Sequence, residues 1–215
     1  MSSPLQETNR NRFDRIAAEW DDSPTRRNLA AGVATAITAA VPLSPKWQAL
    51  EYGCGTGLVG AQLAPHLGHL LACDLSPGML SVLADKAHAS GLDNLETRQL
   101  DLTHEPPPAE RYDLIFSSMT LHHIADVPAL LKMFHGLLRD GGWLALADLD
   151  AEDGSFHSSE AEGVAHHGFE RSKLSQWLET IGFREIQART AHTIEKNAAE
   201  DSTRQYPVFL LTARR

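Results

Sequence analysis

The sequence has little cysteine and no long apolar segment, and each absence argues against a class of protein. Only two cysteines, Cys54 and Cys73, occur in the 215 residues, both within segments of apolar composition. They suggest reduced, structural thiols of a cytoplasmic protein and not a disulfide framework. No apolar run approaches the roughly 20 residues of a membrane helix, and the N-terminus lacks the basic and then apolar pattern of a signal peptide. We therefore expect a cytoplasmic protein without membrane insertion.

An excess of positive charge is also absent. The formal net charge is −9 at pH 7, which disfavours nonspecific binding to nucleic acid or to anionic membranes. The length suits one domain with a sizeable core. We expect a single domain, 1–215, whose partner is a small molecule and not a nucleic acid. The oligomeric state, monomer or dimer, stays open at this point.

A glycine-rich stretch at 48–57 is the most informative part of the chain. A short apolar run ends in Glu51, and Gly53, Gly55 and Gly57 follow at alternate positions. An apolar run, a glycine-rich turn and then a helix are typical of the first βα unit of a nucleotide-binding α/β fold. Leu58 stands where the dinucleotide fingerprint has its third glycine, and no Lys-Ser/Thr pair follows, which argues against a P-loop.

The rest of the chain alternates between strand-like and helix-like patterns, as expected of a parallel α/β fold. Helices are predicted over 5–20, 25–40, 57–66, 76–90, 126–139 and 171–181, and strands over 47–52, 69–74, 94–100, 112–118, 143–149, 183–190 and 206–213. We divide the domain into an N-terminal helical cap (1–45), a core (46–149), a loop (150–170) and a C-terminal helix with strands (171–215). The cap must pack on the sheet or cover its ligand edge. The loop is polar and rich in glycine and histidine, and loops of that length are usually functional or disordered.

Polar side chains follow several of the predicted strands. Asp74 ends the second strand, Asp101 follows the third, and Ser117 and Ser118 end the fourth. Open α/β sheets bind ligands beyond the carboxyl ends of their strands, and a carboxylate there can accept hydrogen bonds from a ribose diol. These residues therefore predict a ligand site at that edge.

The motif from Glu51 to Gly57 resembles the first motif of the class I S-adenosylmethionine-dependent methyltransferases. The segments 112–118 and 138–142 resemble the fourth-strand motif and the turn before the fifth strand of that family, and the match covers about residues 47–149. Among its members the chain is similar to the small-molecule type found in ubiquinone and menaquinone biosynthesis. The resemblance implies an α/β, Rossmann-like fold with helices on both faces. Its seven-stranded, mostly parallel sheet would have the order 3-2-1-4-5-7-6, with the last strand antiparallel.

The resemblance also implies an enzyme that transfers a methyl group from S-adenosyl-L-methionine to a small-molecule acceptor by in-line displacement. The glycine turn would bind the methionine part of the cofactor. Asp74 would accept hydrogen bonds from the ribose, and Asp101 would bind the adenine amino group. The cofactor-binding residues that it implies are Glu51, Gly53, Gly55, Gly57, Asp74, Leu75, Met79, Asp101, Leu102 and Ser117.

Histidines are the candidates for the chemistry, because their pKa lies near neutrality. His122 follows the fourth strand on the ligand side, and we predict that it contacts the acceptor or removes its proton. His157 is the second catalytic candidate, from the 150–170 loop, where His166 and His167 also lie. The alternative for each of these loop histidines, and the one that the polar loop favours, is a solvated side chain. With Asp148 and Asp150 the histidines could furnish metal ligands, but their spacing fits no helical metal motif, and we expect no metal.

Two other functions stay open. A non-catalytic module that binds S-adenosylmethionine would keep the same turn and acids. A nicotinamide-dependent oxidoreductase would use a similar sheet, but Leu58 and Asp101 count against it. Methylation of nucleic acid is a weaker alternative, since Ser117-Ser118-Met119-Thr120 stands where such enzymes carry an Asn/Asp-Pro-Pro-Tyr/Phe motif. The sequence leaves the acceptor atom undecided among O, N, S and C.

Overall fold

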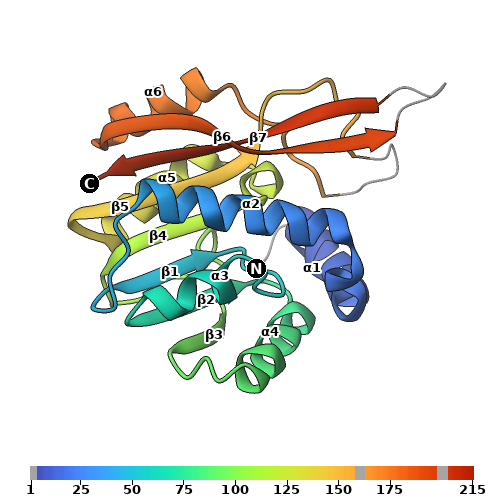
Figure 1. The fold of residues 1–215 in the computed structure, drawn as a ribbon. Coiled ribbons are helices and arrows are strands. Elements are labelled where there is room, and N and C mark those ends of the chain that lie inside the picture. The colour runs from blue at the N-terminus through green and yellow to red at the C-terminus, as the bar shows by residue number, and fades with distance from the viewer. Residues whose placement is uncertain (1–3, 158–162, 198–202) are drawn as a thin grey trace.

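A computed structural model describes residues 4–157, 163–197 and 203–215, and its centre is a seven-stranded sheet in the order β3-β2-β1-β4-β5-β7-β6 (Figure 1). All neighbouring strands pair in parallel except that β7 is antiparallel to both β5 and β6. The predicted strand order and the antiparallel last strand are confirmed. The strands are β1 (Gln48–Tyr52), β2 (His69–Asp74), β3 (Leu95–Gln99), β4 (Tyr112–Ser118), β5 (Leu138–Leu149), β6 (Arg184–Asn197) and β7 (Thr203–Arg214).

Helices cover both faces of this sheet (Figure 1). On one face lie α2 (Pro24–Ala40), α3 (Gly60–Leu63) and α4 (Pro77–Ala89); on the other lie α5 (Val127–Leu137) and α6 (Arg171–Ile181). The central strands are buried on both sides, as parallel strands between helices are. Leu50 packs with Leu131 and Phe134 on one face, while Ala49 packs with Ile37 and Leu63 on the other.

The N-terminal segment has a different place. Helix α1 (Pro4–Ile16) and the 3₁₀ helix η1 (Ala17–Asp22) lie past the carboxyl ends of the strands (Figure 1). The helix predicted over 5–20 is therefore divided at Ile16, and this part of the cap covers the ligand edge while α2 packs on the sheet. Within the described ranges, no helix is long and apolar enough to cross a bilayer.

Several predicted boundaries were wrong. The helix predicted over 126–139 ends at Leu137, and β5 begins at Leu138 instead of Trp143. Gly141 and Gly142, a pair typical of a helix end, lie instead within β5, where a Cβ on Gly142 would be 2.9 Å from the Arg139 carbonyl oxygen. The helix predicted over 57–66 contains a turn, α3 and then the 3₁₀ helix η2 (Ala64–His66). Strands β6 and β7 are longer than predicted, because their polar ends pair with each other beyond the hydrophobic core.

Candidate active site at the carboxyl edge of the sheet

One cavity of about 500 Å³ lies at the carboxyl ends of the central strands. The glycine turn and Asp74 form part of its wall, and a group of histidines forms another part. Phe13 of α1 and Trp20 of η1 also line it, and their rings pack edge to face with centroids 5.7 Å apart. The N-terminal cap thus closes the cavity from outside the sheet.

The glycine turn exposes bare backbone to this cavity. Gly53, Gly55 and Gly57 have φ of 72°, 53° and 74°, in the left-handed region that glycine tolerates best. A Cβ on Gly53 would fall 2.2 Å from Thr120 Oγ1, whereas a Cβ on Gly55 would meet nothing within 4 Å. Gly53 is therefore needed for close packing, and Gly55 leaves open space in which a ligand can approach the main chain.

Asp74 holds the turn in place at the end of β2. Its carboxylate accepts hydrogen bonds from the Gly55 amide at 2.8 Å and from the Ser76 amide at 2.9 Å. Burial raises the pKa of this carboxyl, an effect that the backbone hydrogen bonds oppose. Leu75 and Met79 lie beside it on the cavity wall. The structure thus brings together the acid and the apolar side chains that the sequence assigned to the ribose and the adenine.

Glu51 ends β1 on the same wall with an unusual carboxylate. Its side chain is buried, and Oε2 lies against Gly60, where an added Cβ would fall 2.1 Å from it. Burial raises the pKa of this carboxyl to about 8, an effect that the Gly60 backbone amide opposes. The Oε2 atom is therefore directed toward the start of α3, while Glu51 forms part of the cavity wall.

Four of the predicted cofactor residues lie behind the wall. Gly57 packs against Leu83, Leu102 is buried, and Ser117 donates a hydrogen bond to the Tyr52 carbonyl at 2.7 Å. Asp101 is also buried.

The Asp101 carboxylate accepts hydrogen bonds from the Thr103 amide at 2.9 Å and the Thr103 hydroxyl at 2.6 Å, and it lies 3.1 Å from His104 Nδ1. Leu100, its neighbour, does line the cavity. A direct contact of Asp101 with adenine stays a prediction.

Two acids that sequence reasoning did not assign attach the cap to the cofactor side of the cavity. Asp14 Oδ1 accepts hydrogen bonds from the Ser76 hydroxyl at 2.6 Å and the Gly78 amide at 2.9 Å. Asp21 accepts one from the Thr56 hydroxyl at 2.6 Å and pairs with Lys86. The cap is thus tied to the glycine turn and to the N-terminus of α4.

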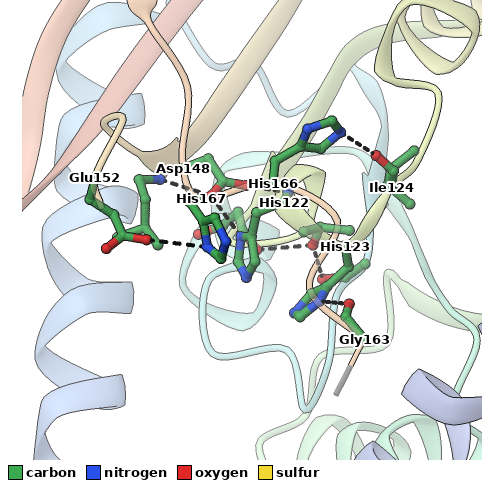
Figure 2. Close-up of polar contacts among 12 residues, drawn as sticks. His122, His123, Ile124, Asp148, Glu152, Gly163, His166 and His167 are labelled. Atoms are coloured by element: carbon green, nitrogen blue, oxygen red, sulfur yellow. Dashed lines mark hydrogen bonds and ion pairs between the residues drawn. The ribbon is translucent and has the colours of Figure 1, made fainter. Parts of the chain in front are cut away.

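The histidine end contains a buried pair, His122 and Asp148, shown in Figure 2. His122 lies in the 3₁₀ helix η3 (Leu121–His123) and lines the cavity. Its Nδ1 is 2.7 Å from Asp148 Oδ1, and its backbone amide donates to Asp148 Oδ2 at 3.3 Å. The two side chains are 3% and 0% exposed. Burial opposes ionisation of Asp148, but the adjacent His122 ring and its hydrogen bond hold the pKa of the carboxyl below its usual range.

Two further histidines surround this pair. His123 Nδ1 lies 2.7 Å from the Gly163 carbonyl oxygen, and burial, together with the nearby His122, lowers the pKa of His123 to about 3. The His157 ring centroid is 5.1 Å from that of His122, and burial lowers the pKa of His157 to about 4. Both rings are therefore neutral at pH 7.

His157 thus reaches the cavity, as predicted, while the other loop histidines do not line it. His166 Nε2 is 2.9 Å from the Ile124 carbonyl oxygen, and His167 lies 3.6 Å from Glu152 (Figure 2). Within the described ranges, no three His, Cys, Asp or Glu side chains are grouped so as to hold a metal ion. Part of the predicted loop, residues 158–162, lies outside the described residues.

Basic side chains on the cavity wall were also missed. Arg10, Arg12, Arg26 and Lys196 line it, although the chain as a whole is acidic. Lys196 donates a hydrogen bond to the Phe156 carbonyl, and its Nζ lies 3.8 Å from the centroid of the Phe156 ring. Lys196 arrives from the far end of β6, and nothing in its local sequence indicates that position.

Comparison with known proteins gives a consistent result. The family model described as "Methyltransferase domain" matches residues 49–142. An uncharacterised methyltransferase of Schizosaccharomyces pombe is 31% identical over 132 residues, 55% of this chain and 46% of that protein. A malonyl-[acyl-carrier protein] O-methyltransferase of Dechloromonas aromatica is 33% identical over 144 residues, 65% of this chain and 50% of that protein.

Among solved structures, a DhpI–SAH complex superposes with a TM-score of 0.76 at 22% identity, covering 100% of this chain and 98% of the other. That likeness concerns the fold. The chain spans at most half the length of the curated relatives described above.

Proposed function

We propose that this chain is a class I S-adenosylmethionine-dependent methyltransferase, as its match to the methyltransferase family model over residues 49–142 supports, and that it transfers the cofactor's methyl group to a small-molecule acceptor bound at the histidine end of the cavity. The observation that carries this proposal is that one cavity of about 500 Å³ joins the glycine turn and Asp74 to His122. Sites for small ligands commonly have such volumes. A cofactor at one end would therefore present its methyl group toward the other.

The residues at the first end fit the cofactor. Gly55 leaves open space at the main chain, Asp74 offers carboxylate oxygens, and Glu51 lines the same wall. S-adenosylmethionine supplies a methyl group activated by a positively charged sulfonium. The Asp74 carboxylate favours binding of a ligand with positive charge, and the Leu75 and Met79 side chains would pack against the adenine.

The residues at the other end would orient the acceptor, exclude water and take up a proton. The cap side chains Phe13 and Trp20 cover the cavity, so that substrates held beneath them are close and aligned, which is the main requirement of a displacement reaction. We propose His122 as the base and His157 as a contact for the acceptor. The curated relatives include an O-methyltransferase and, in plants, phosphoethanolamine N-methyltransferases, so their names do not decide the acceptor atom. We also propose a cytoplasmic location.

Two measurements test this proposal in sequence. Titration calorimetry should show binding of S-adenosylmethionine and S-adenosylhomocysteine and none of NADH. A screen of small acceptors with methyl-labelled cofactor should then yield a labelled product. Tighter binding of NADH than of S-adenosylhomocysteine would contradict the cofactor assignment. Cofactor binding without labelled product from any acceptor would favour the non-catalytic binding module instead.

A further inference from the structure

The His122–Asp148 pair carries an inference about the kind of acceptor. We propose that Asp148 is a positioning residue that fixes His122 with its proton on Nδ1, and that the acceptor is a compound with an un-ionised hydroxyl of phenol or enol type. This inference rests on the proposed methyl transfer, and it goes further by naming the substrate class and a residue that acts through the base.

The contacts of Asp148 determine which nitrogen of His122 carries the proton. The Oδ1 atom accepts a hydrogen bond from the Leu149 amide at 2.8 Å, and Oδ2 accepts one from the His122 amide at 3.3 Å. An ionised carboxylate can only accept, so the His122 Nδ1 atom at 2.7 Å from Oδ1 must be the donor. A neutral imidazole with Nδ1 protonated has a free lone pair on Nε2. Asp148 therefore makes His122 a base at Nε2.

The backbone of His122 is held as firmly as its ring. The His122 carbonyl accepts hydrogen bonds from the Ala165 amide at 2.8 Å and the His166 amide at 3.0 Å. With the side chain only 3% exposed, little water competes for Nδ1. The orientation of the base is thus set by two segments, namely the end of β5 with Asp148 and the part of the loop with Ala165 and His166.

The charges around the ring support this assignment. The groups that face His122 are Asp148 from β5, His123 from its own turn, and His157 from the loop. His123 and His157 are neutral at pH 7, because burial lowers the pKa of each, to about 3 and about 4. The charged groups Lys196, Arg12 and Glu152 act on His157. Asp148 is therefore the only anion in contact with the His122 ring among the described residues, and it would stabilise the imidazolium formed during the reaction.

The base would support methyl transfer to a hydroxyl oxygen, a step in which every bond and proton is accounted for. The acceptor oxygen forms a bond to the methyl carbon while the bond from that carbon to sulfur breaks, and the bonding pair stays on sulfur, which becomes a neutral thioether. The acceptor proton moves to His122 Nε2. A carboxylate is already ionised at pH 7 and needs no base, whereas a phenol, with a pKa of about 10, does.

The side chains on the cavity wall favour a hydroxyl acceptor over an amine acceptor. A free amine is protonated at pH 7, with a pKa of about 10. Away from Glu51 and Asp74, the wall carries the basic side chains Arg10, Arg12, Arg26 and Lys196 against a single acid, Glu195, and this excess of positive charge disfavours a cation there. The rings of Phe13, Trp20 and Phe156 line the same cavity and suit a flat, apolar acceptor body. Together they favour an aromatic or enolic hydroxyl compound.

The tautomer can be measured without any acceptor. In protein labelled with ¹⁵N-histidine and saturated with S-adenosylhomocysteine, long-range ¹H–¹⁵N spectra at pH 7 should contain an imidazole protonated at Nδ1 whose signals are lost in His122→Gln, in addition to the signals of His123, whose Nδ1 donates to the Gly163 carbonyl. The matched control His135→Gln, in α5 against Phe183, should leave that signal in place. A His122 signal with the proton on Nε2, or with both nitrogens protonated, would overturn the positioning role of Asp148.

Activity then tests the acceptor class. The probes are a matched set, 4-methylphenol, 4-methylthiophenol, 4-methylbenzylamine and 4-methylbenzoate, together with maltol as an enol that stays un-ionised at pH 7. The wild-type protein should methylate the phenol or the enol and not the amine. Asp148→Asn should lower that rate by about 100-fold or more, while any transfer to the thiol should change less than about threefold. The control Asp126→Asn, which alters the N-cap of α5, should keep the hydroxyl activity.

The outcomes separate this inference from the proposed function. Methylation of the amine or the benzoate but of neither hydroxyl compound would overturn the hydroxyl assignment while methyl transfer stands. Full hydroxyl activity in Asp148→Asn would overturn the positioning role. Binding of S-adenosylhomocysteine with no transfer to any probe would overturn the hydroxyl assignment and weaken methyl transfer itself, and the ¹⁵N spectra would still decide the role of Asp148.

Discussion

The two ends of the cavity are built in different ways. At the cofactor end, Glu51, the glycine turn and Asp74 come from two consecutive strands and the turn after the first of them, and much of the surface is backbone. At the histidine end, η3, the end of β5, the 150–170 loop and the end of β6 each contribute side chains. The first end carries the Asp74 carboxylate, and the second carries histidines with the basic side chains of Arg12 and Lys196 nearby.

This difference between the two ends separates the residues proposed to bind the cofactor from those proposed to act on the acceptor. A cofactor of constant structure can be bound by one local stretch of chain, because backbone atoms and a few nearby side chains supply its contacts. An acceptor site assembled from distant segments can change one side chain at a time without disturbing the glycine turn. Substitutions at the histidine end should therefore affect turnover, and those at the cofactor end should affect binding and folding.

The largest expected effect is at His122. His122→Ala removes the proposed base and should lower turnover by about 10²–10⁴-fold, while S-adenosylhomocysteine affinity stays within about threefold, under 1 kcal/mol. The matched variant His123→Ala removes a ring that contacts Gly163 and should cost less. Steady-state rates and calorimetry on both proteins decide. Equal losses in the two variants would contradict the assigned role.

Gly53→Ala should have the next largest effect, at the other end. The residue has a φ of 72°, and the added Cβ would lie 2.2 Å from Thr120 Oγ1. Backbone strain of this kind typically costs about 1–3 kcal/mol, with loss of packing in addition, so both thermal stability and cofactor binding should fall. Gly136→Ala is the control, because it lies within α5 with open space around it. A Gly53→Ala protein as stable as wild type would show that the turn can rearrange.

Asp74→Ala should weaken binding of S-adenosylhomocysteine by roughly tenfold or more, since hydrogen bonds to a charged group contribute about 1.5–3 kcal/mol. Part of that loss would come from the turn itself, because Asp74 also accepts from the Gly55 amide. The exposed Asp85 of α4 provides the matched control, Asp85→Ala. An unchanged dissociation constant in calorimetry would limit Asp74 to a structural role.

The smallest expected effect concerns Glu51 and pH. Burial raises the pKa of its carboxyl from 4.5 to about 8 in the folded protein, so between these values the folded state binds more protons than the unfolded state. Its contribution to stability is therefore complete below about pH 4.5 and declines as the pH rises toward 8. Glu51→Gln should remove this decline and make the unliganded protein more stable than wild type at pH 8, by about 1–3 kcal/mol. Denaturant unfolding at several pH values measures it, and equal pH dependence in the two proteins would contradict the buried, proton-binding carboxyl.

The cofactor end could be predicted from the sequence because its signals are local. The run into Glu51, the alternate glycines and the acid at the end of the next strand all lie within residues 48–74. The sheet order followed from the family resemblance, and the structure confirmed it. By contrast, the end of α5 was placed too late, because the glycines at 141 and 142 indicated a helix end and instead lie within β5.

Most partners at the histidine end could not be predicted, for a physical reason. The sequence indicates His122 by its place after a strand, but Asp148 belongs to a strongly apolar strand, and only strand pairing shows that the two meet. In the sequence, Asp14 and Asp21 look like ordinary polar residues on the surface of a helix. Only the structure shows that they bind α4 and the glycine turn. The position of Lys196 at the cavity depends on the β6–β7 hairpin, whose pairing continues beyond its hydrophobic part.

The pairing of β4 with β5 has a consequence for how this chain can change in length. Ser118 pairs with Ala147, which places Asp148 level with the turn that carries His122. Side chains alternate between the two faces of a strand, so a shift of one residue would turn Asp148 away from the histidine. A residue inserted at the exposed Ala125, between η3 and α5, would leave this strand register unchanged. A single insertion or deletion between Trp143 and Asp148 would separate the pair while leaving the composition of the protein almost unchanged.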